Sequence, residues 1–351
     1  MTHRALRFAL AAVVLSTAAC ADKASTPLAP ASGSALAPPL SFSYDGSNRP
    51  NGLDQAVIQI MPIKSGAAQN ESGFASRQQN RSSGTGIYYH GGPVLQAGTK
   101  VAAVYWASSP IYNGGPAPGS FGTTVSSDGS LIGFFLSHLG GSSYYNINSS
   151  YTDGAGHAIV NSVTYTQYWA NNSNVPANGA NVTDAQIVAM LQSGFSSGAL
   201  SYDASTLYHV FTAGKVNLGG GFGTQYCAYH AYATVTIGTA SKTVLYSAMP
   251  YDYAYPSACT NGTASPNGDP AADAEVNVLA HETEETTTDM FGSAWFDNRG
   301  YENADKCAWV WGSTQKASNG GVFNISLSGK NFLVQENWVN SGSGGCLQHW
   351  P

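Results

Sequence analysis

The chain has 351 residues, of which 43% are hydrophobic and only 10% are charged, and its formal net charge is −6. The apolar content is sufficient for one sizeable core. The low charge and the absence of a basic cluster argue against a nucleic-acid partner. A sequence with 40 Gly and 20 Tyr but few charges suits a turn-rich extracellular protein.

Residues 1–19 have the pattern of an export signal. Two arginines precede an apolar run over residues 8–15, and small residues then lead to Cys20. These small residues resemble a lipobox, which would make Cys20 a lipidated residue, whereas ordinary signal cleavage next to Cys20 is the alternative. The apolar run is far shorter than the ~20 residues of a transmembrane helix. We therefore expect either an outer-membrane, periplasmic or cell-surface lipoprotein, which contacts the membrane only through the lipid on Cys20, or a secreted protein.

The export signal is followed by a predicted tether and one domain. Residues 20–50 are rich in Pro, Ala and Ser, a composition typical of a flexible linker rather than of a core. Residues 51–351 contain neither an internal repeat nor a second tether, so we expect a single domain. A short apolar stretch at 56–61 predicts a strand at the edge of a sheet.

The domain alternates predicted strands with predicted helices, which indicates an α/β fold with a twisted mixed sheet. Glycines end the first helix, a Thr183/Gln186 capping box begins the second, and residues 238–242 form a hairpin-length link. The predicted strands are 101–106, 207–213, 226–237, 243–249 and 332–339, and the predicted helices are 131–139, 183–191 and 270–288.

The helix at 270–288 has an unusual charge distribution. Asp269 is a suitable N-cap, and Pro270 stands at the first helical position, where its missing N–H is harmless. Near the end of the helix, however, acidic residues face the negative pole of the helix dipole, and no Lys or Arg follows until Arg299. A local arrangement that opposes stability points to a functional site, and a bound cation would compensate it. These late acidic residues are Glu282, Glu284 and Glu285.

The spacing within this helix predicts a metal site. His281 and Glu285 are four residues apart and project from the same face, so both can bind one ion. Glu282 lies beside them, in the place of the general base in the H-E-x-x-H metalloprotease helix, whose second His is Glu in this chain. The alternative is that His281 and its acidic neighbours are core polar groups that hold no metal.

A third ligand is expected from the segment that follows. Glu302 would bind the metal and Asp305 would orient His281 through its other ring nitrogen, although these two roles can be exchanged. Glu284 is a further candidate for a second-shell or alternative ligand. One imidazole, two carboxylates and an open position suit catalytic Zn²⁺, although another divalent metal is possible. Zinc would acidify its water, and Glu282 would take the proton.

Four cysteines remain when Cys20 is set aside, and an even number in an exported chain favours disulfides. Three pairings are possible. Proximity in the sequence favours Cys227–Cys259 and Cys307–Cys346, and the second bond would hold down the Glu302/Asp305 loop. A zinc site of four thiolates is the weaker alternative, since the chain lacks C-x-x-C spacing.

Two further histidines stand beside tyrosines. His90 and His230 are either structural hydrogen-bonding residues or substrate-binding residues near the metal. A Ser–His–Asp hydrolase has little support, because the chain lacks a G-x-S-x-G motif.

A set of short motifs resembles the EXORDIUM-like (phosphate-induced protein) family over residues 86–351. One departure is Met290, where relatives usually have Pro. The resemblance implies a secreted protein, and plant members are linked to extracellular growth and cell-wall responses. In addition, the helix motif resembles that of zincin metallopeptidases, and Glu302 and Asp305 stand where gluzincins have Glu followed shortly by Asp. The motifs are Y-H-G-G-P-V-L at 89–95, V-Y-W at 104–106, Y-C-A-Y-H at 226–230, S-P-N-G-D at 265–269, L-A-H-E-T-E-E-T-T-T-D at 279–289, E-N-A-D-K-C at 302–307, F-L-V-Q-E-N-W-V-N at 332–340 and G-G-C at 344–346.

These observations predict a zincin-like α/β domain with its metal-site helix at 270–288 packed on the sheet and a C-terminal region stapled by disulfides. The leading hypothesis is a zinc-dependent hydrolase that acts on peptide bonds outside the cytoplasm, with Glu282 as general base. The second is a non-catalytic module that binds a cell-envelope polymer or a partner, with a structural metal or none. A glycosidase is a third possibility.

Overall fold

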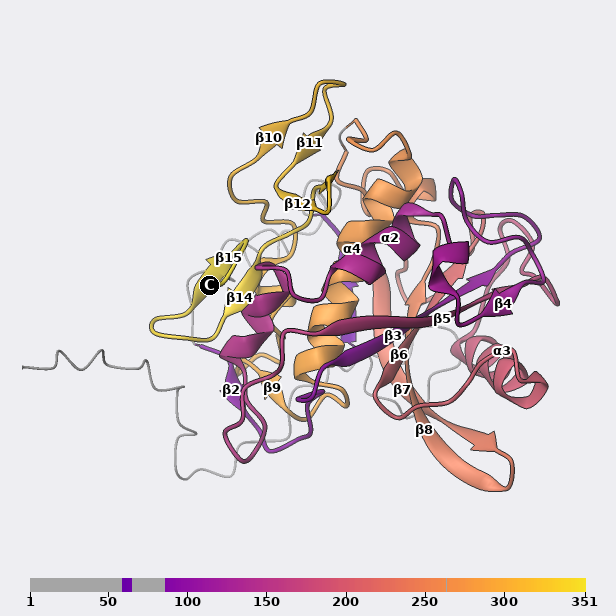
Figure 1. Cartoon of the computed structure of the whole chain (residues 1–351), viewed down its shortest axis with the longest axis horizontal. Coiled ribbons are helices and arrows are strands. Elements are labelled where there is room, and N and C mark those ends of the chain that lie inside the picture. Colours follow the sequence, from indigo (N-terminus) through magenta and orange to yellow (C-terminus); the bar gives the residue numbers. More distant parts are fainter. Residues whose placement is uncertain (1–58, 65–85, 263) are drawn as a thin grey trace, which may run out of the picture.

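The computed structural model describes residues 59–64, 86–262 and 264–351. Within these residues the main element is a mixed sheet with the strand order β1-β7-β8-β6-β3-β5-β4 (Figure 1). The predicted export signal, Cys20 and the tether lie outside the described residues. The strands of this sheet are β1 (Gln59–Pro62), β3 (Thr99–Trp106), β4 (Phe121–Gly122), β5 (Val163–Asn171), β6 (Thr206–Thr212), β7 (Tyr226–Ile237) and β8 (Ala240–Met249).

The centre of the sheet is parallel and its edges are antiparallel. Strand β3 runs parallel to both β5 and β6, and β6 runs parallel to β8. Strands β7 and β8 form an antiparallel hairpin, while β1 pairs antiparallel with the outer side of β7. The α/β class and the mixed sheet that the sequence predicts are thereby confirmed. Residues 59–61 of the predicted stretch at 56–61 lie in the expected edge strand, and its first three residues lie outside the described residues.

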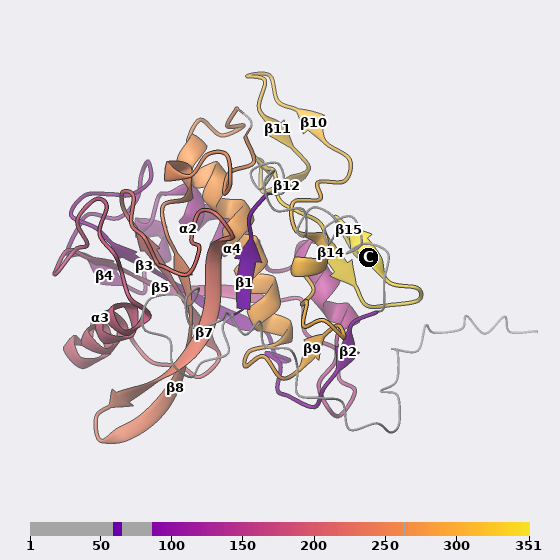
Figure 2. The same ribbon diagram turned by 180° about the vertical axis from the view of Figure 1, so that it is seen from behind.

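Two cores lie on opposite faces of the sheet, because successive side chains of a strand point to opposite sides. Helices α2 (Leu131–His138) and α4 (Pro270–Thr288) cover one face, and α3 (Asp184–Ser197) covers the other (Figures 1 and 2). Strand β3 divides its residues between them. Val101 and Ala103 pack in the core of α2 and α4, whereas Ala102 and Val104 pack in the core of α3.

The ends of α3 follow from local chemistry. Thr183 and Gln186 form a capping box at its N-terminus, as the sequence predicts. The helix continues beyond the predicted end at residue 191 and stops at Gly198, which has a φ of 78°. Glycine adopts this left-handed conformation without steric cost and therefore ends the helix.

Helix α4 has the predicted bounds and is buried along its length. The Asp269 side chain accepts a hydrogen bond from the Ala272 backbone N–H, and Pro270 opens the helix. Threonines, which are poor helix formers, fill its second half. Their hydroxyls donate to carbonyls one turn earlier, from Thr283 to Leu279 and from Thr286 to Glu282, so these polar side chains are satisfied inside the protein.

Short hairpins in the last part of the chain cover the side of α4 that faces away from the sheet (Figure 1). Disulfides join Cys227 to Cys259 and Cys307 to Cys346, which confirms the expected pairing and excludes a site of four thiolates. None of the helices in the described residues is long and apolar enough to cross a membrane. The short strands pair as β2 (Tyr88–Tyr89) with β9 (Trp295–Phe296), β10 (Gln315–Lys316) with β11 (Val322–Phe323), β12 (Ile325–Leu327) with β13 (Lys330–Phe332), and β14 (Asn337–Val339) with β15 (Gly345–Leu347).

The structure corrects the strand predictions at three places. The predicted strand at 332–339 is interrupted, because the backbone N–H groups of Gln335 and Glu336 donate to the Asn277 side chain and the Val310 carbonyl rather than to a neighbouring strand. Strand β5 was not predicted at all, although β-branched and aromatic residues fill it. The link between β7 and β8 is also tighter than residues 238–242, since β8 already begins at Ala240.

Candidate metal centre

Three segments bring histidines and carboxylates together beneath the sheet. Helix α4 supplies His281, Glu282 and Glu285, which its period places on neighbouring faces. Strand β7 supplies His230. The loop at the 3₁₀ turn η4 (Asp305–Cys307) supplies Glu302 and Asp305, and we call these six residues the buried cluster.

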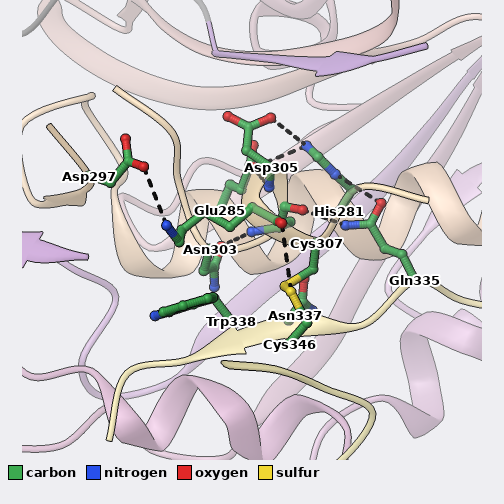
Figure 3. Close-up of a disulfide and its surroundings, with 12 residues drawn as sticks. His281, Glu285, Asp297, Asn303, Asp305, Cys307, Gln335, Asn337, Trp338 and Cys346 are labelled. Carbon is green, nitrogen blue, oxygen red and sulfur yellow. Dashed lines mark hydrogen bonds and ion pairs between the residues drawn. A yellow bond between two sulfur atoms is a disulfide. The ribbon is translucent and has the colours of Figure 1, made fainter. Parts of the chain in front are cut away.

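His281 faces carboxylates on one side of its ring and an amide on the other (Figure 3). Its Nε2 lies 3.0 Å from Oε1 of Glu285 and 3.7 Å from Oδ1 of Asp305. Its Nδ1 lies 3.3 Å from Oε1 of Gln335, whose side-chain N–H donates to the Ala304 carbonyl. Gln335 therefore takes the orienting position that the sequence analysis gave to Asp305, and Asp305 stands on the ligand side of the ring.

His230 occupies the centre of the second half of the buried cluster. Its Nδ1 lies 2.9 Å from Oε2 of Glu282 and 3.7 Å from Oε2 of Glu285. Its Nε2 lies 3.6 Å from Oε2 of Glu302. Consequently Glu285 presents one oxygen to each histidine, and Glu302 faces His230 rather than His281.

The buried cluster is enclosed and carries an excess of acidic groups. Four of its members, namely His281, Glu282, Glu285 and Glu302, have no exposed surface. Among the described residues, Lys306 is the one buried Lys or Arg side chain, and its Nζ lies 3.3 Å from Asp297, which does not belong to the buried cluster. Isolated buried carboxylates are costly unless protons, partners or a metal neutralise them.

Burial shifts the pKa values of these groups. Loss of solvation raises the pKa of Glu282 well above its usual value, and the nearby Glu285 and Asp305 carboxylates raise it further. Glu302 is affected in the same direction, because burial raises its pKa most and the charge of Glu285 adds to this. Burial lowers the pKa of His230 to about 3, so this imidazole is neutral at ordinary pH. Neutral imidazoles bind metals, and raised carboxylate pKa values are typical of functional sites.

Two groups within the buried cluster have spacings suited to a metal ion. One consists of His281, Glu285 and Asp305, and the other of His230, Glu282 and Glu285; in each group the ligand atoms lie within 4.8 Å of one another. Imidazole nitrogen with carboxylate oxygens is a donor set that suits zinc and related transition metals. In the first group, the contact of His281 with Gln335 provides the outer support that metal-binding histidines usually have.

Two of the candidates from the sequence analysis have other surroundings. Glu284 points away from the buried cluster and accepts a hydrogen bond from the Asn148 side chain. His90 stacks on Phe296, with ring centroids 3.6 Å apart, and its Nε2 lies 3.1 Å from the Phe296 carbonyl oxygen.

Comparison with known proteins gives the family. The conserved region of phosphate-induced protein 1 matches residues 137–341, more than half of the chain. The chain belongs to the EXORDIUM-like, phosphate-induced protein family. Protein EXORDIUM-like 3 of Arabidopsis thaliana is 23% identical over 288 residues, which cover 72% of this chain and 80% of that relative. No solved structure matches the chain significantly.

The region shared with the phosphate-induced protein family contains the whole buried cluster, since its members lie between His230 and Asp305. Together with the two disulfides, membership of the EXORDIUM-like family indicates an extracellular protein.

Sequence reasoning did not single out Gln335, the residue that orients His281. The available signal was weak, because Gln335 is a polar residue within the apolar run F-L-V-Q-E and lies 54 residues from His281. Only the folded chain shows that this run passes beside α4.

Proposed function

We propose that this EXORDIUM-like protein is a zinc-dependent hydrolase of peptide bonds with a zincin-like site, in which the buried cluster holds the metal. The strongest support is that two imidazoles, which can bind a metal when neutral, lie together with four carboxylates. Among the described residues, no buried Lys or Arg lies with them. Such a cluster needs a cation or several protons.

Unsatisfied polar atoms support a fit to a metal ion. Both carboxylate oxygens of Glu302, Oε1 of Glu282 and Nε2 of His230 are buried without a hydrogen-bond partner in the described part of the chain. Buried polar atoms are nearly always satisfied in folded proteins, so these atoms beside the His281, Glu285 and Asp305 group call for protons or for a bound cation with its water. We assign His281, Glu285 and Asp305 as the ligands, with Glu302 as the alternative third carboxylate.

Glu282 is the proposed proton acceptor. Bound zinc would polarise the substrate carbonyl and acidify water. Glu282 would take the proton of that water as its oxygen joins the carbonyl carbon, and would deliver it to the amine when the C–N bond breaks. Burial raises the pKa of Glu282 in the metal-free protein, and the positive charge of a bound metal would oppose this shift, which would leave the carboxylate free to act as a base. Neutral His230, 2.9 Å from Glu282, keeps its carboxylate in place.

Metal analysis of purified protein tests the assignment, with Glu285→Gln and Glu284→Gln as a matched pair. We expect about one zinc per chain in the wild type and in Glu284→Gln, and no stoichiometric zinc in Glu285→Gln. The two side chains are adjacent on α4 and equally buried, but only Glu285 faces His281. A wild type without zinc after zinc-replete expression contradicts the proposal.

Glu282→Gln then separates catalysis from binding. We expect this variant to keep its zinc and to hydrolyse an unfolded protein substrate at least 100-fold more slowly, because general-base catalysis contributes typically 10²–10⁴-fold.

One specific observation favours a second candidate, a non-catalytic extracellular module with a structural metal. The proposed ligands His281 and Glu285 have no exposed surface, whereas a catalytic site must admit its substrate. In that case zinc removal lowers the melting temperature, and Glu282→Gln has no effect on any hydrolysis assay.

A further inference from the structure

Strand β1 lies at the edge of the sheet, directly beside the buried cluster. It pairs antiparallel with β7, with Gln59 opposite His230 and Met61 opposite Ala228. The other neighbour of β7 is β8, so β7 would form the edge of the sheet if β1 were absent. Figure 2 shows β1 next to both β7 and α4.

The main chain of β1 approaches the proposed proton acceptor. The Met61 backbone N–H lies near the Glu282 carboxylate. The Met61 side chain has no exposed surface and packs in the core beneath α4. An extended chain in the place of β1 therefore carries a peptide group past Glu282 and a side chain into an apolar site.

Backbone groups hold this segment in place. The Ile63 N–H donates to the Gln225 carbonyl at 3.1 Å, and the Lys64 N–H donates to the Ala258 carbonyl at 2.9 Å. The Pro62 carbonyl accepts from the Trp309 indole N–H at 2.7 Å. Main-chain hydrogen bonds to a sheet edge bind extended peptides of varied sequence, while pockets for alternate side chains give selectivity.

We propose that β1 occupies the substrate-binding site, and that the substrate is an extended polypeptide segment that pairs antiparallel with β7 in its place. This inference rests on the proposed hydrolase function and names its substrate class and binding mode. It accounts for the burial of the proposed catalytic residues, because the site is closed by a segment of the same chain. An apolar residue at the position of Met61 is the expected preference.

The first test uses the full-length chain with the recognition sequence of a specific protease inserted between Lys64 and Gly86. Cutting there leaves β1 attached only by non-covalent contacts. We expect the cut protein to exchange its N-terminal fragment for a fluorescent peptide of the β1 sequence, Q-I-M-P-I-K. We also expect it to hydrolyse an unfolded protein substrate at least tenfold faster than the uncut protein, with unchanged zinc content.

A second test needs no cleavage and compares Met61→Ala with Met190→Ala. Both methionines are buried, at 0% and 5% exposure, but Met190 belongs to α3 and packs in the opposite core. Both variants lose a similar amount of apolar side-chain packing, whereas only Met61→Ala weakens the contacts that hold β1 against β7 and α4. We expect at least tenfold faster hydrolysis for Met61→Ala alone, together with faster hydrogen exchange of the β7 amides that pair with β1.

The outcomes separate the two proposals. A wild type without zinc contradicts the proposed function itself. Zinc together with a hydrolysis rate that depends on Glu282, but does not change after cutting or in Met61→Ala, overturns the inference and leaves the hydrolase standing. Departure of the N-terminal fragment from a zinc-loaded protein that still cleaves no polypeptide contradicts the inference and the hydrolase proposal together, and favours the module with a structural metal.

Discussion

Asp289 ends helix α4 with a buried carboxylate, and its replacement by Asn tests how burial acts on stability. The Asp289 Oδ1 accepts hydrogen bonds from the Ser293 and Ala294 backbone N–H groups, at 2.6 and 2.8 Å. Asn keeps this acceptor oxygen. Burial nevertheless raises the pKa of Asp289 to about 6, against these hydrogen bonds, which lower it. The negative helix pole also disfavours a charge here.

The sign and size of the effect follow from proton linkage. Folded protein holds the Asp289 proton up to higher pH than unfolded protein, so the stability of the wild type falls as pH rises from about 4 to about 6. The shift of the pKa from 3.8 to about 6 corresponds to about 3 kcal/mol, at about 1.4 kcal/mol per pKa unit. Asp289→Asn does not titrate, so its stability relative to the wild type should rise by about 3 kcal/mol over this range.

Urea unfolding of both metal-free proteins at several pH values between 3.5 and 7 measures this difference. Asp203→Asn is the control of opposite sign, because a hydrogen bond from Lys100 lowers the pKa of Asp203 to about 2. Its stability relative to the wild type should fall as pH rises from about 2 to about 4 and should be nearly constant above pH 4, where that of Asp289→Asn rises. Stability curves of Asp289→Asn and wild type that run parallel across the whole range refute the reasoning.

Three further predictions concern the stability of the fold. Loss of the disulfide in Cys307→Ser/Cys346→Ser, which closes a sequence separation of 39, should lower the free energy of unfolding by about 4 kcal/mol in the chain-entropy treatment. Thr183→Ala, which removes the α3 cap, should cost about 1 kcal/mol, and an unchanged urea midpoint contradicts the role of the capping box. Phe332→Ala should cost about 3–5 kcal/mol, because this side chain is fully buried. Phe121→Ala, at a side chain that is 55% exposed, is its control and should change stability by less than about 0.5 kcal/mol.

The sequence was most informative where local chemistry determines structure. The bounds of α4 were predicted because Asp269 and Pro270 define its start, and the start of α3 because Thr183 and Gln186 cap it. The pairing of the cysteines was also predicted from their proximity in the chain. In each case the interacting groups are near one another in sequence.

The sequence was least informative where distant segments meet. The predicted strand at 332–339 is interrupted because Gln335 bonds to Asn277, 58 residues away, and no periodicity reports such a contact. The same holds for the metal centre. The four-residue spacing on α4 predicted that His281 and Glu285 lie on one face. The proximity of Glu302 to His230, in contrast, depends on how β7 and the η4 loop pack. Ligand roles within the cluster therefore required the tertiary structure.

Residues 335–346 pack beside α4, and this has a consequence for the order in which the protein folds. Gln335 contacts His281, and the backbone N–H of Trp338 donates to the Asn303 carbonyl. A disulfide joins Cys346 to Cys307, close to Asp305 in the chain. A chain that emerges from its N-terminus during synthesis lacks these contacts until residue 346 has appeared. The carboxylates of α4 then stay hydrated until the last hairpins close over them. Assembly of the buried cluster is therefore complete only when residues 335–346 have packed beside α4.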